Sequence, residues 1–441
     1  MIYFLFVLLT ILMIINYSIN RNILIPSFIM CMSFWLVALI YVICSSIISD
    51  PIGEKTVGII IFSILFFWCG EIIGNGICNR GNVTRYATID RCVSEDSIEI
   101  NNCMIVFFII LILVSAYIRM AALCNMVETN VSIKSFVSSY ATIRFYLIHG
   151  RSPIIPKWTE YMPIIAPCIV RVCITVFSYN FIRYRIIQKK YLGVIVSFIL
   201  YLVTSTSRTV FLDLVAYSIF QFFFLELFLF GKLPMIKWKT IKPVVLSVIL
   251  FASCFSLIGR MAQKSAPIVE TIFAYTAAAF IGLDNFLNNP YYAENILSSR
   301  TLQGVFSPFD RVGLKLPKLE EYLPHYFYLG GKATSNEYTS LMEPYHDFGL
   351  GGMLMSRVLL GVVFGLLLGY IVKQSNKGKK YYLIPMLGPV YYSLVLSAID
   401  DQFSTLLSMY YIYQLIFTWI IWKACITIVN NRTKIKRRLK W

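Results

Sequence analysis

A polar stretch late in the chain gathers residue types that commonly do chemistry. It runs from Asn336 to Gly352 and holds His346 directly before Asp347. An imidazole with an ordinary pKa of about 6.5 can take a proton from a hydroxyl near neutral pH. We expect Asp347 to cap the helix that follows, which favours its charged form and leaves His346 the better proton acceptor. The plainer alternative is that His346 is only a polar residue at a bilayer interface.

Arginines form a second set of candidates, because a guanidinium fork fits phosphate oxygens. Arg208 follows the hydroxyl-rich run 204–207 and could bind phosphate, or could simply extend to the membrane interface. Arg171 lies inside an apolar run, where a charge costs about 2.5–3.5 kcal/mol and needs a partner or a function. Asp213 and Glu71 are possible partners, so structural pairing and phosphate binding both remain open for Arg171. Further candidates in the long polar interval are Arg260, Arg300, Arg311 and His325.

Several common catalytic patterns are absent from the sequence. It contains no G-x-x-x-x-G-K-[ST] loop, no H-E-x-x-H and no cysteine–histidine cluster, so nucleotide hydrolysis and zinc chemistry lack support. No cysteine lies between Cys254 and Cys425. The triplet Asp347-Phe348-Gly349 matches the kinase metal-binding triplet by chance, since no H-R-D loop accompanies it. We therefore expect a site without a metal or another cofactor.

The composition is that of a polytopic membrane protein. Of 441 residues, 58% are hydrophobic and 14% charged, and the mean hydropathy is +0.72, which is too apolar for a soluble protein of this length. The formal net charge of +17 comes from basic residues in short loops, as membrane orientation requires. No soluble basic domain exists to bind nucleic acid, so we expect no nucleic-acid partner.

The apolar runs predict an all-α protein with about eleven transmembrane helices of roughly 20 residues each. The first eight fall within 1–259, a long extracytoplasmic loop covers 260–347, the last three fall within 348–426, and 427–441 is a basic tail. The individual runs are 2–17, 26–49, 57–74, 103–125, 161–182, 191–205, 209–230, 243–259, 348–372, 381–399 and 404–426. The interval 131–147 predicts a helix lying on the outer surface, and 268–281 predicts another such helix or a re-entrant segment. The alternative for both is a packing element that covers a loop.

Lysine and arginine collect in alternate loops, which sets the expected orientation. The basic clusters at 183–190, 232–242, 373–380 and 432–440 fall on one side of the membrane if eleven spans are counted. That side is predicted to be the cytoplasm. The polar interval and the connection 400–402 then lie on the opposite face.

Three motifs in this order carry a resemblance to a known family. They are Ser207-Arg208, then Gly282-Leu283-Asp284-Asn285-Phe286, then Asn336-x-Tyr338-Thr339 followed by Tyr345-x-Asp347-Phe348-Gly349-x-x-Gly352 at the start of a span. With the number of spans and the late outer loop, the sequence resembles the O-antigen polymerases, the Wzy-type oligosaccharide repeat-unit polymerases of bacterial surface polysaccharide assembly.

The resemblance implies a metal-independent glycosyltransferase with a helical fold of the C type, multi-pass in the bacterial inner membrane and with its active site facing the periplasm. It would transfer a growing glycan from undecaprenyl diphosphate to the non-reducing end of a lipid-linked repeat unit. A chain-length regulator and a flippase are the further partners implied. Arg208 would then act in catalysis with His346 and Asp347. The substrate-binding residues would be Arg171, Arg260, Arg300, Arg311, His325, Asn336, Tyr338 and Tyr345.

Two other functions stay open at this point. A ligase of the O-antigen type would share the donor site but use lipid A core as acceptor. A flippase for lipid-linked oligosaccharides would also have many spans and buried cations, although such transporters usually show internal repeats and short loops.

Overall fold

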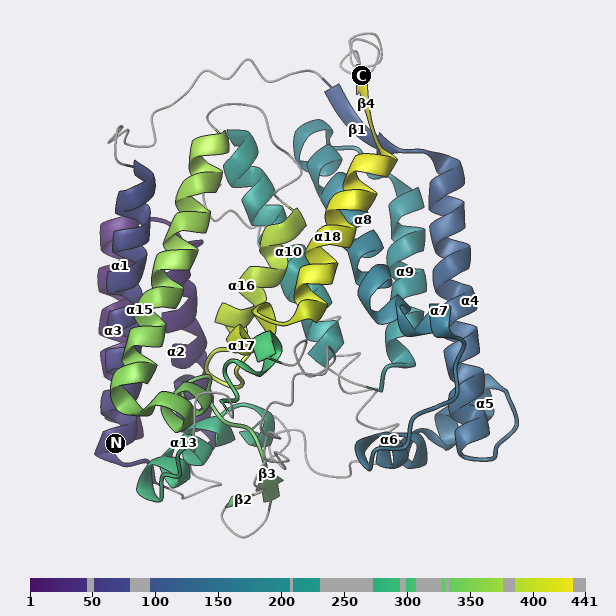
Figure 1. The fold of residues 1–441 in the computed structure, drawn as a ribbon. Helices are drawn as coiled ribbons and strands as arrows, with labels where there is room; N and C mark the ends of the chain where they lie inside the picture. The colour runs from purple at the N-terminus through teal and green to yellow at the C-terminus, as the bar shows by residue number, and fades with distance from the viewer. Residues whose placement is uncertain are drawn as a thin grey trace. The chain divides into compact units, whose positions relative to one another are not determined.

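The computed structural model forms two compact units that interleave along the chain (Figure 1). Unit 1 comprises Met1–Ala87, Ala266–Lys377 and Val390–Ile412, and unit 2 comprises Thr88–Ser265, Gly378–Pro389 and Tyr413–Trp441. The structure describes residues 1–45, 51–79, 96–206, 209–230, 273–293, 299–306, 327–329, 333–375 and 385–430.

Unit 1 is a bundle of helices. Its members are α1 (Ile2–Asn20), α2 (Pro26–Cys44), α3 (Glu54–Asn79), α13 (Ala278–Asn288), α15 (Met342–Ser375), α17 (Phe403–Leu406), most of α16 (Leu387–Leu396) and the start of α18 (Met409–Cys425). Arg21 ends α1 in the left-handed conformation, and Pro26 begins α2, where its missing N–H removes no hydrogen bond. These local signals turn the chain sharply between the first two helices.

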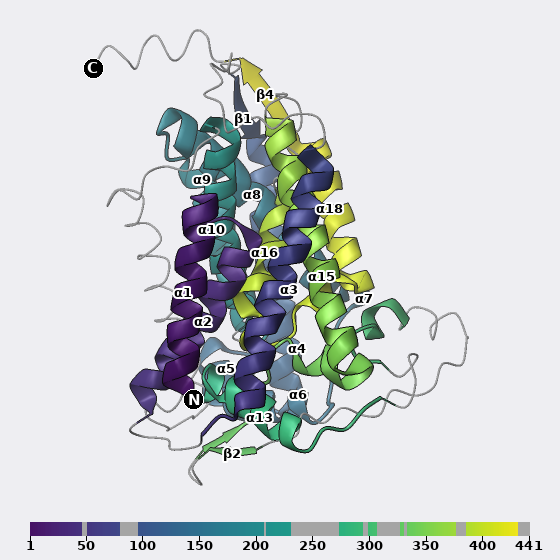
Figure 2. The same cartoon turned by 90° about the vertical axis from the view of Figure 1, so that its left-hand side faces the viewer.

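Helices α3 and α15 lie side by side along much of their length (Figures 1 and 2). Glycines bring their backbones into direct contact. A β-carbon on Gly70 would lie 2.1 Å from the Val358 carbonyl oxygen, and one on Gly361 would lie 2.1 Å from the Phe67 oxygen. This small-residue spacing is how spanning helices approach closely, because lipid provides no hydrophobic drive between them. The contact fixes α15 firmly against α3.

Unit 2 contains the remaining helices. These are α4 (Asn102–Met126), α5 (Ile133–Ser138), α6 (Tyr140–Ile148), α7 (Lys157–Glu160), α8 (Met162–Tyr184), α9 (Lys189–Val203), α10 (Thr209–Phe230) and the remaining parts of α16 and α18. Asn101 caps α4 by accepting from the Cys103 N–H at 3.0 Å, and Ser132 caps α5 by accepting from the Ser135 N–H at 3.0 Å. Both caps stand where the sequence changes from polar to apolar.

Two small sheets accompany the helices. In unit 2, β1 (Asp96–Ile100) pairs antiparallel with β4 (Ile426–Asn430), with Ile98 opposite Ile428. The Asn180 amide bonds both backbone groups of Ile98, at 3.3 and 2.7 Å, and so ties β1 to α8. In unit 1, β2 (Phe327–Leu329) pairs with β3 (Ala333–Ser335). The expectation of an all-α protein thus holds for the bulk of the described chain but missed these two-stranded sheets.

Seven helices in the described part of the chain are long and apolar enough to cross a membrane, namely α1, α2, α3, α4, α8, α10 and α15. This confirms the helical membrane class. The predicted runs at 191–205, 381–399 and 404–426 instead give α9 of 15 residues, α16 of 10 and α18 of 17. The run 243–259 lies outside the described residues. A total of eleven spans therefore stays a prediction.

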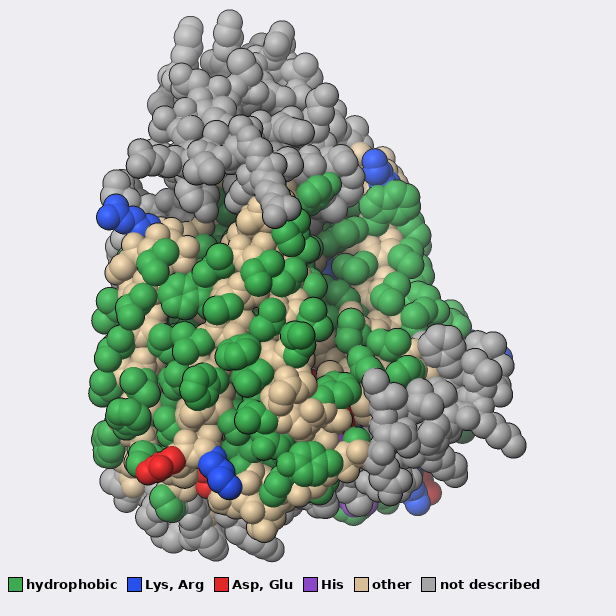
Figure 3. Space-filling view, turned by 60° about the vertical axis from the view of Figure 1, so that its left-hand side comes forward, with side chains coloured by type: hydrophobic (Ala, Val, Ile, Leu, Met, Phe, Trp, Pro, Cys, Tyr) green, Lys and Arg blue, Asp and Glu red, His purple; other side chains and the backbone are tan. Residues whose placement is uncertain are grey.

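Apolar side chains on the spanning helices face outward. Phe62 on α3 and Leu359 and Val363 on α15 are all at least 50% exposed, and Figure 3 shows hydrophobic side chains over one face with charged residues near its margins. Such a surface suits lipid rather than water. The non-spanning helix predicted at 131–147 forms as α5 and α6, interrupted at Ser139. The interval 268–281 holds the start of α13, and its residues 268–272 lie outside the described part.

Candidate active site

The polar stretch from Asn336 to Gly352 forms a loop followed by a kinked helix. Helix α15 begins at Met342 and leaves helical geometry at Gly349, with φ 65° and ψ −172°. A positive φ favours glycine, which has no β-carbon to clash. The residues from Met342 to Phe348 therefore form a separate first segment of α15. A β-carbon on Gly352 would lie 2.1 Å from the Phe348 Cβ, so this second glycine leaves room for the Phe348 side chain.

His346 and Asp347 form a buried pair in this first segment. The His346 Nδ1 lies 2.8 Å from Asp347 Oδ1, and their side chains are 5% and 0% exposed. The second oxygen, Oδ2, accepts from the Thr301 N–H at 2.7 Å. Asp347 therefore holds both the His346 ring and the loop at Thr301 in place. The sequence had predicted instead that Asp347 caps a helix. The difference arises because α15 begins at Met342, which places Asp347 beyond the first turn.

Aromatic rings and Arg300 surround the pair. Tyr291 meets the His346 ring edge to face at 5.0 Å between centroids, and the Ala293 N–H donates to the His346 carbonyl at 3.0 Å. The Arg300 guanidinium carbon lies 5.8 Å from the centre of the Tyr291 ring. The chain from Tyr291 to Ala293 thus runs along the first segment of α15. His346, Asp347 and Arg300, three of the predicted site residues, come together here.

A group of carboxyls adjoins this pair. The Glu343 side chain hydrogen-bonds that of Asp401, with Asp400 and Asp347 also close enough to act on its charge. Two carboxyls can share a hydrogen bond only when one of them keeps a proton. Burial raises the pKa of the Asp401 carboxyl, which agrees with a shared proton. With one proton held between them, Glu343 and Asp401 would together carry one negative charge.

Arg357 supplies the opposite charge. It lies in the spanning part of α15, is 0% exposed, and interacts electrostatically with Asp401. Its Nη1 donates to Ser340 Oγ at 3.4 Å and its Nη2 to the Ser340 carbonyl, while its Cζ lies 5.1 Å from the centre of the Phe403 ring. Within the described residues, Arg357 Nε has no hydrogen-bond partner. Such buried unsatisfied groups are uncommon and call for a reason.

The glycine and aspartate of the Gly282-to-Phe286 motif hold this region together. A β-carbon on Gly282 would lie 2.6 Å from the Glu337 carbonyl oxygen, so only glycine lets α13 approach the loop before α15. Asp284 Oδ1 accepts from the Gly53 N–H at 2.6 Å and from Thr56 Oγ1 at 2.5 Å, at the start of α3. The motif is therefore explained by the way α13 packs against the site loop and α3.

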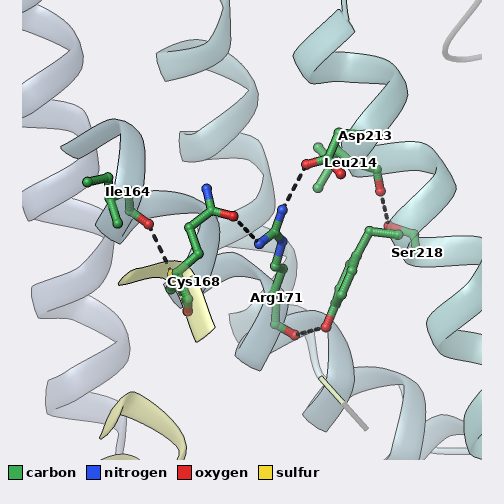
Figure 4. A network of polar contacts seen from close by, with 8 residues as sticks. Ile164, Cys168, Arg171, Asp213, Leu214 and Ser218 are labelled. Atoms are coloured by element: carbon green, nitrogen blue, oxygen red, sulfur yellow. Dashed lines mark hydrogen bonds and ion pairs between the residues drawn. The ribbon is translucent and has the colours of Figure 1, made fainter. Parts of the chain in front are cut away.

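Arg171 belongs to a different network, in unit 2 (Figure 4). Its Nη2 lies 3.0 Å from Asp213 Oδ2 on α10, and its Nη1 donates to Gln414 Oε1 on α18 at 2.7 Å. The Tyr217 hydroxyl donates to the Arg171 carbonyl at 2.9 Å. Of the two partners predicted from sequence, Asp213 is the one that pairs. Glu71 instead accepts from the Ser27 N–H at 2.7 Å in unit 1. The geometry favours structural pairing, and phosphate binding by Arg171 stays a prediction.

The remaining predicted residues divide into two groups. Tyr345 lies beside His346 in the first segment, and Asn336 and Tyr338 lie in the loop before it, all in unit 1. The predicted residues Arg208, Arg260, Arg311 and His325 lie outside the described residues.

Sequence reasoning missed Arg357 and the pairing of Glu343 with Asp401. A signal for Arg357 was available, because it is an arginine within an otherwise apolar run, the same feature that singled out Arg171. The carboxyl pair had no comparable signal. Glu343 and Asp401 are far apart in sequence, and only the fold brings them together.

Comparison with known proteins adds no family assignment: no protein-family model, no curated protein and no solved structure matches this chain. Among the described residues, no three His, Cys, Asp or Glu side chains are grouped as a metal site would require.

Proposed function

We propose that this protein is a membrane glycosyltransferase that polymerises lipid-linked oligosaccharide repeat units. The observation that carries the proposal is the buried His346–Asp347 pair, 2.8 Å apart, at the point where a long polar interval leads into a spanning helix. A histidine held by a carboxylate at one ring nitrogen is arranged to take a proton at the other. The family resemblance of the surrounding motifs then supplies the substrate class.

The proposed step joins two lipid-linked glycans. The acceptor hydroxyl oxygen forms a bond to the anomeric carbon of the donor sugar, and the bond from that carbon to the diphosphate oxygen breaks. The hydroxyl proton passes to His346 Nε2, because Asp347 holds Nδ1. Undecaprenyl diphosphate leaves with the developing negative charge. Arg300 is the arginine of the described site that can stabilise this charge.

Access to His346 requires a local movement. The residue is only 4% exposed, and the Tyr291 ring lies against its imidazole. Tyr291 must therefore turn aside before an acceptor hydroxyl can reach Nε2. The segment that carries Tyr291 is held to the first segment of α15 by the hydrogen bond from Ala293 to His346, so we expect opening of the site to separate these two segments.

Assembly of product by the purified protein tests the proposal directly. The protein is placed in lipid vesicles with one kind of lipid-linked repeat unit, and the glycans are separated by length. A polymerase yields a ladder of lengthened lipid-linked products. Extension only after addition of lipid A core would instead identify a ligase, and repeat units that cross the bilayer unchanged would identify a transporter.

The periplasmic orientation is part of the proposal and has its own test. Ile154 is 98% exposed in a loop predicted to be periplasmic, and Ile187 is 61% exposed in a loop predicted to be cytoplasmic. In a cysteine-free background, Ile154→Cys in intact spheroplasts should react with a membrane-impermeant thiol reagent, and Ile187→Cys should react only after lysis. The reverse labelling pattern contradicts the proposed orientation.

Transport remains the second candidate because one observation favours it. A carboxyl pair that shares a proton, balanced by Arg357 on a spanning helix, resembles the buried ionisable groups of proton-coupled transporters. If the protein is a transporter, repeat-unit movement in vesicles should depend on an imposed pH gradient, and Glu343→Gln should remove that dependence. A glycosyltransferase should form products at the same rate with or without the gradient.

A further inference from the structure

Two stacked tyrosines adjoin the candidate active site. Tyr292 and Tyr345 stack with their ring centroids 6.3 Å apart and their planes 22° from parallel. Phe286 supports Tyr345 from the side, edge to face at 5.7 Å. Tyr345 directly precedes His346, and Tyr292 directly follows Tyr291, which lies against the same imidazole. The stacked pair is therefore continuous with the proposed proton acceptor.

Tyr292 packs one side of its ring against Tyr345 and leaves much of the ring uncovered. It is 55% exposed, so most of its ring contributes no buried area to the fold. An exposed aromatic face beside a polar site can stack on the C–H face of a sugar ring, which is apolar while its edge carries hydroxyls. The Tyr292 and Tyr345 hydroxyls hydrogen-bond each other, and their remaining lone pairs can accept a hydrogen bond from a ligand.

The chain before Tyr292 supplies amides. Asn285, Asn288 and Asn289 are exposed at the end of α13. Asn288 also donates to Asp284 Oδ2 at 3.1 Å, which orders this end of the helix. Amides and hydroxyls bind neutral hydroxyl groups, whereas a phosphate site would favour arginine and lysine. The surface is therefore suited to an uncharged, polyhydroxylated ring.

We propose that Tyr292 and Tyr345 form a platform on which a sugar ring of the acceptor glycan stacks beside His346. This inference rests on the proposed function, because it assigns the acceptor subsite of that same reaction. It predicts that Tyr292 contributes to acceptor binding and not to the chemical step. Stacking on one exposed ring corresponds to roughly a tenfold change in affinity when the ring is removed.

The test uses the cell's own glycan as probe. Cells from which this protein has been deleted should accumulate its lipid-linked substrate, and mild acid releases the free oligosaccharide from that lipid fraction. Binding of this oligosaccharide is measured by saturation-transfer NMR to the full-length protein in nanodiscs. Tyr292→Ala should weaken binding roughly tenfold, and Tyr292→Phe should retain most of it because the ring remains.

A matched control comes from unit 2. Tyr161 is 57% exposed, close to the exposure of Tyr292, and Tyr161→Ala should leave binding unchanged. In the product assay, Tyr292→Ala should raise the KM for the repeat unit and leave kcat nearly unchanged. Thermal unfolding of Tyr292→Ala at the parental temperature shows that the fold is intact.

The outcomes separate the platform from the function. If Tyr292→Ala binds the oligosaccharide as tightly as the parent, the platform is wrong and Tyr292 is an anchor at the membrane interface, whatever the product assay shows. If Tyr292→Ala binds the oligosaccharide more weakly but the parent protein makes no lengthened product, the platform is supported and the proposed polymerase activity is wrong. If no lipid-linked repeat accumulates in the deletion cells, the proposed function fails and the sugar platform fails with it.

Discussion

Arg171 in unit 2 and Arg357 in unit 1 are both buried in spanning helices, yet their surroundings differ. Arg171 directs its two terminal nitrogens at Asp213 and Gln414, at 3.0 and 2.7 Å. Arg357 has Ser340 as its hydrogen-bond partner and interacts with Asp401, whose carboxyl hydrogen-bonds that of Glu343. The first network has side-chain partners from two other helices, whereas the second leaves Arg357 Nε without a partner among the described residues.

The different surroundings of Arg171 and Arg357 indicate how a structural buried cation can be distinguished from a functional one. A charge that is satisfied by fixed partners holds helices together and has little left to offer a ligand. A charge beside groups that can gain or lose a proton experiences a different electrostatic environment when a proton is bound or released there, as at many functional sites. Arg357 and the His346–Asp347 pair lie in the same unit. They are connected through Asp401, which interacts with Arg357, and Glu343, which interacts with both Asp401 and Asp347.

The largest expected effect is at His346. His346→Ala should lower the turnover of lipid-linked repeats by about 10²–10⁴-fold, since it removes the general base, while binding of the donor lipid persists. His346→Gln should recover little. Asp347→Asn should also lose most of the activity, because the amide no longer holds the imidazole with its Nδ1 protonated. Both quantities are measured on purified protein with one substrate. Turnover at the parental rate in His346→Ala would exclude histidine catalysis and make Glu343 the next residue to examine.

Arg357 should matter next most, through stability. Arg357→Leu leaves the carboxyl group without its counter-charge in a fully buried place, at a cost of about 3–5 kcal/mol. Arg357→Lys retains the charge and should unfold at an intermediate temperature, because it loses the fork that reaches Ser340. Thermal unfolding in nanodiscs compares the three proteins. Equal stability of Arg357→Leu and the parent would mean that the cluster is already neutral without the arginine.

A smaller effect should appear as a pH dependence. Burial raises the pKa of Asp401, so its contribution to stability is complete below the unfolded value of about 3.9 and is lost as pH rises through the folded value. The parent should therefore lose stability as the pH rises above the unfolded value. Asp401→Asn should flatten this slope while Glu343 remains to balance Arg357. Identical slopes for parent and variant, measured as unfolding temperature against pH, would contradict the shared proton.

The smallest effect is expected from an apolar replacement of the Arg171 pair. Arg171→Met with Asp213→Leu removes both charges at once, which is often neutral for stability when the shapes fit. Product formation should also stay close to the parental rate if the pair is structural. Loss of donor binding in this double variant, with the fold intact, would instead restore the phosphate-binding role that the sequence left open.

Hydropathy was sufficient to predict the class of the fold and most helix positions. The runs at 2–17, 26–49 and 103–125 correspond to α1, α2 and α4, because twenty apolar residues in lipid have few alternatives to a helix. Helix ends were less predictable, since α16 ends at Leu396 although its apolar run continues to 399. The adjacency of His346 and Asp347 is visible in the sequence. The carboxyl pair is not, since it depends on how residues 397–401 return to Ser340, whose N–H donates to the Ser397 carbonyl at 3.0 Å.

The glycine contacts between α3 and α15 have a mechanical consequence. Where two backbones touch, neither helix can slide or rotate without a steric clash. The part of α15 from Val358 onward is therefore held in place against α3. The first segment, with His346 and Asp347, is joined to the rest of α15 through Gly349, whose positive φ already departs from the helix. We therefore expect Gly349 to act as a hinge, which lets His346 and Asp347 move while the rest of α15 stays packed against α3.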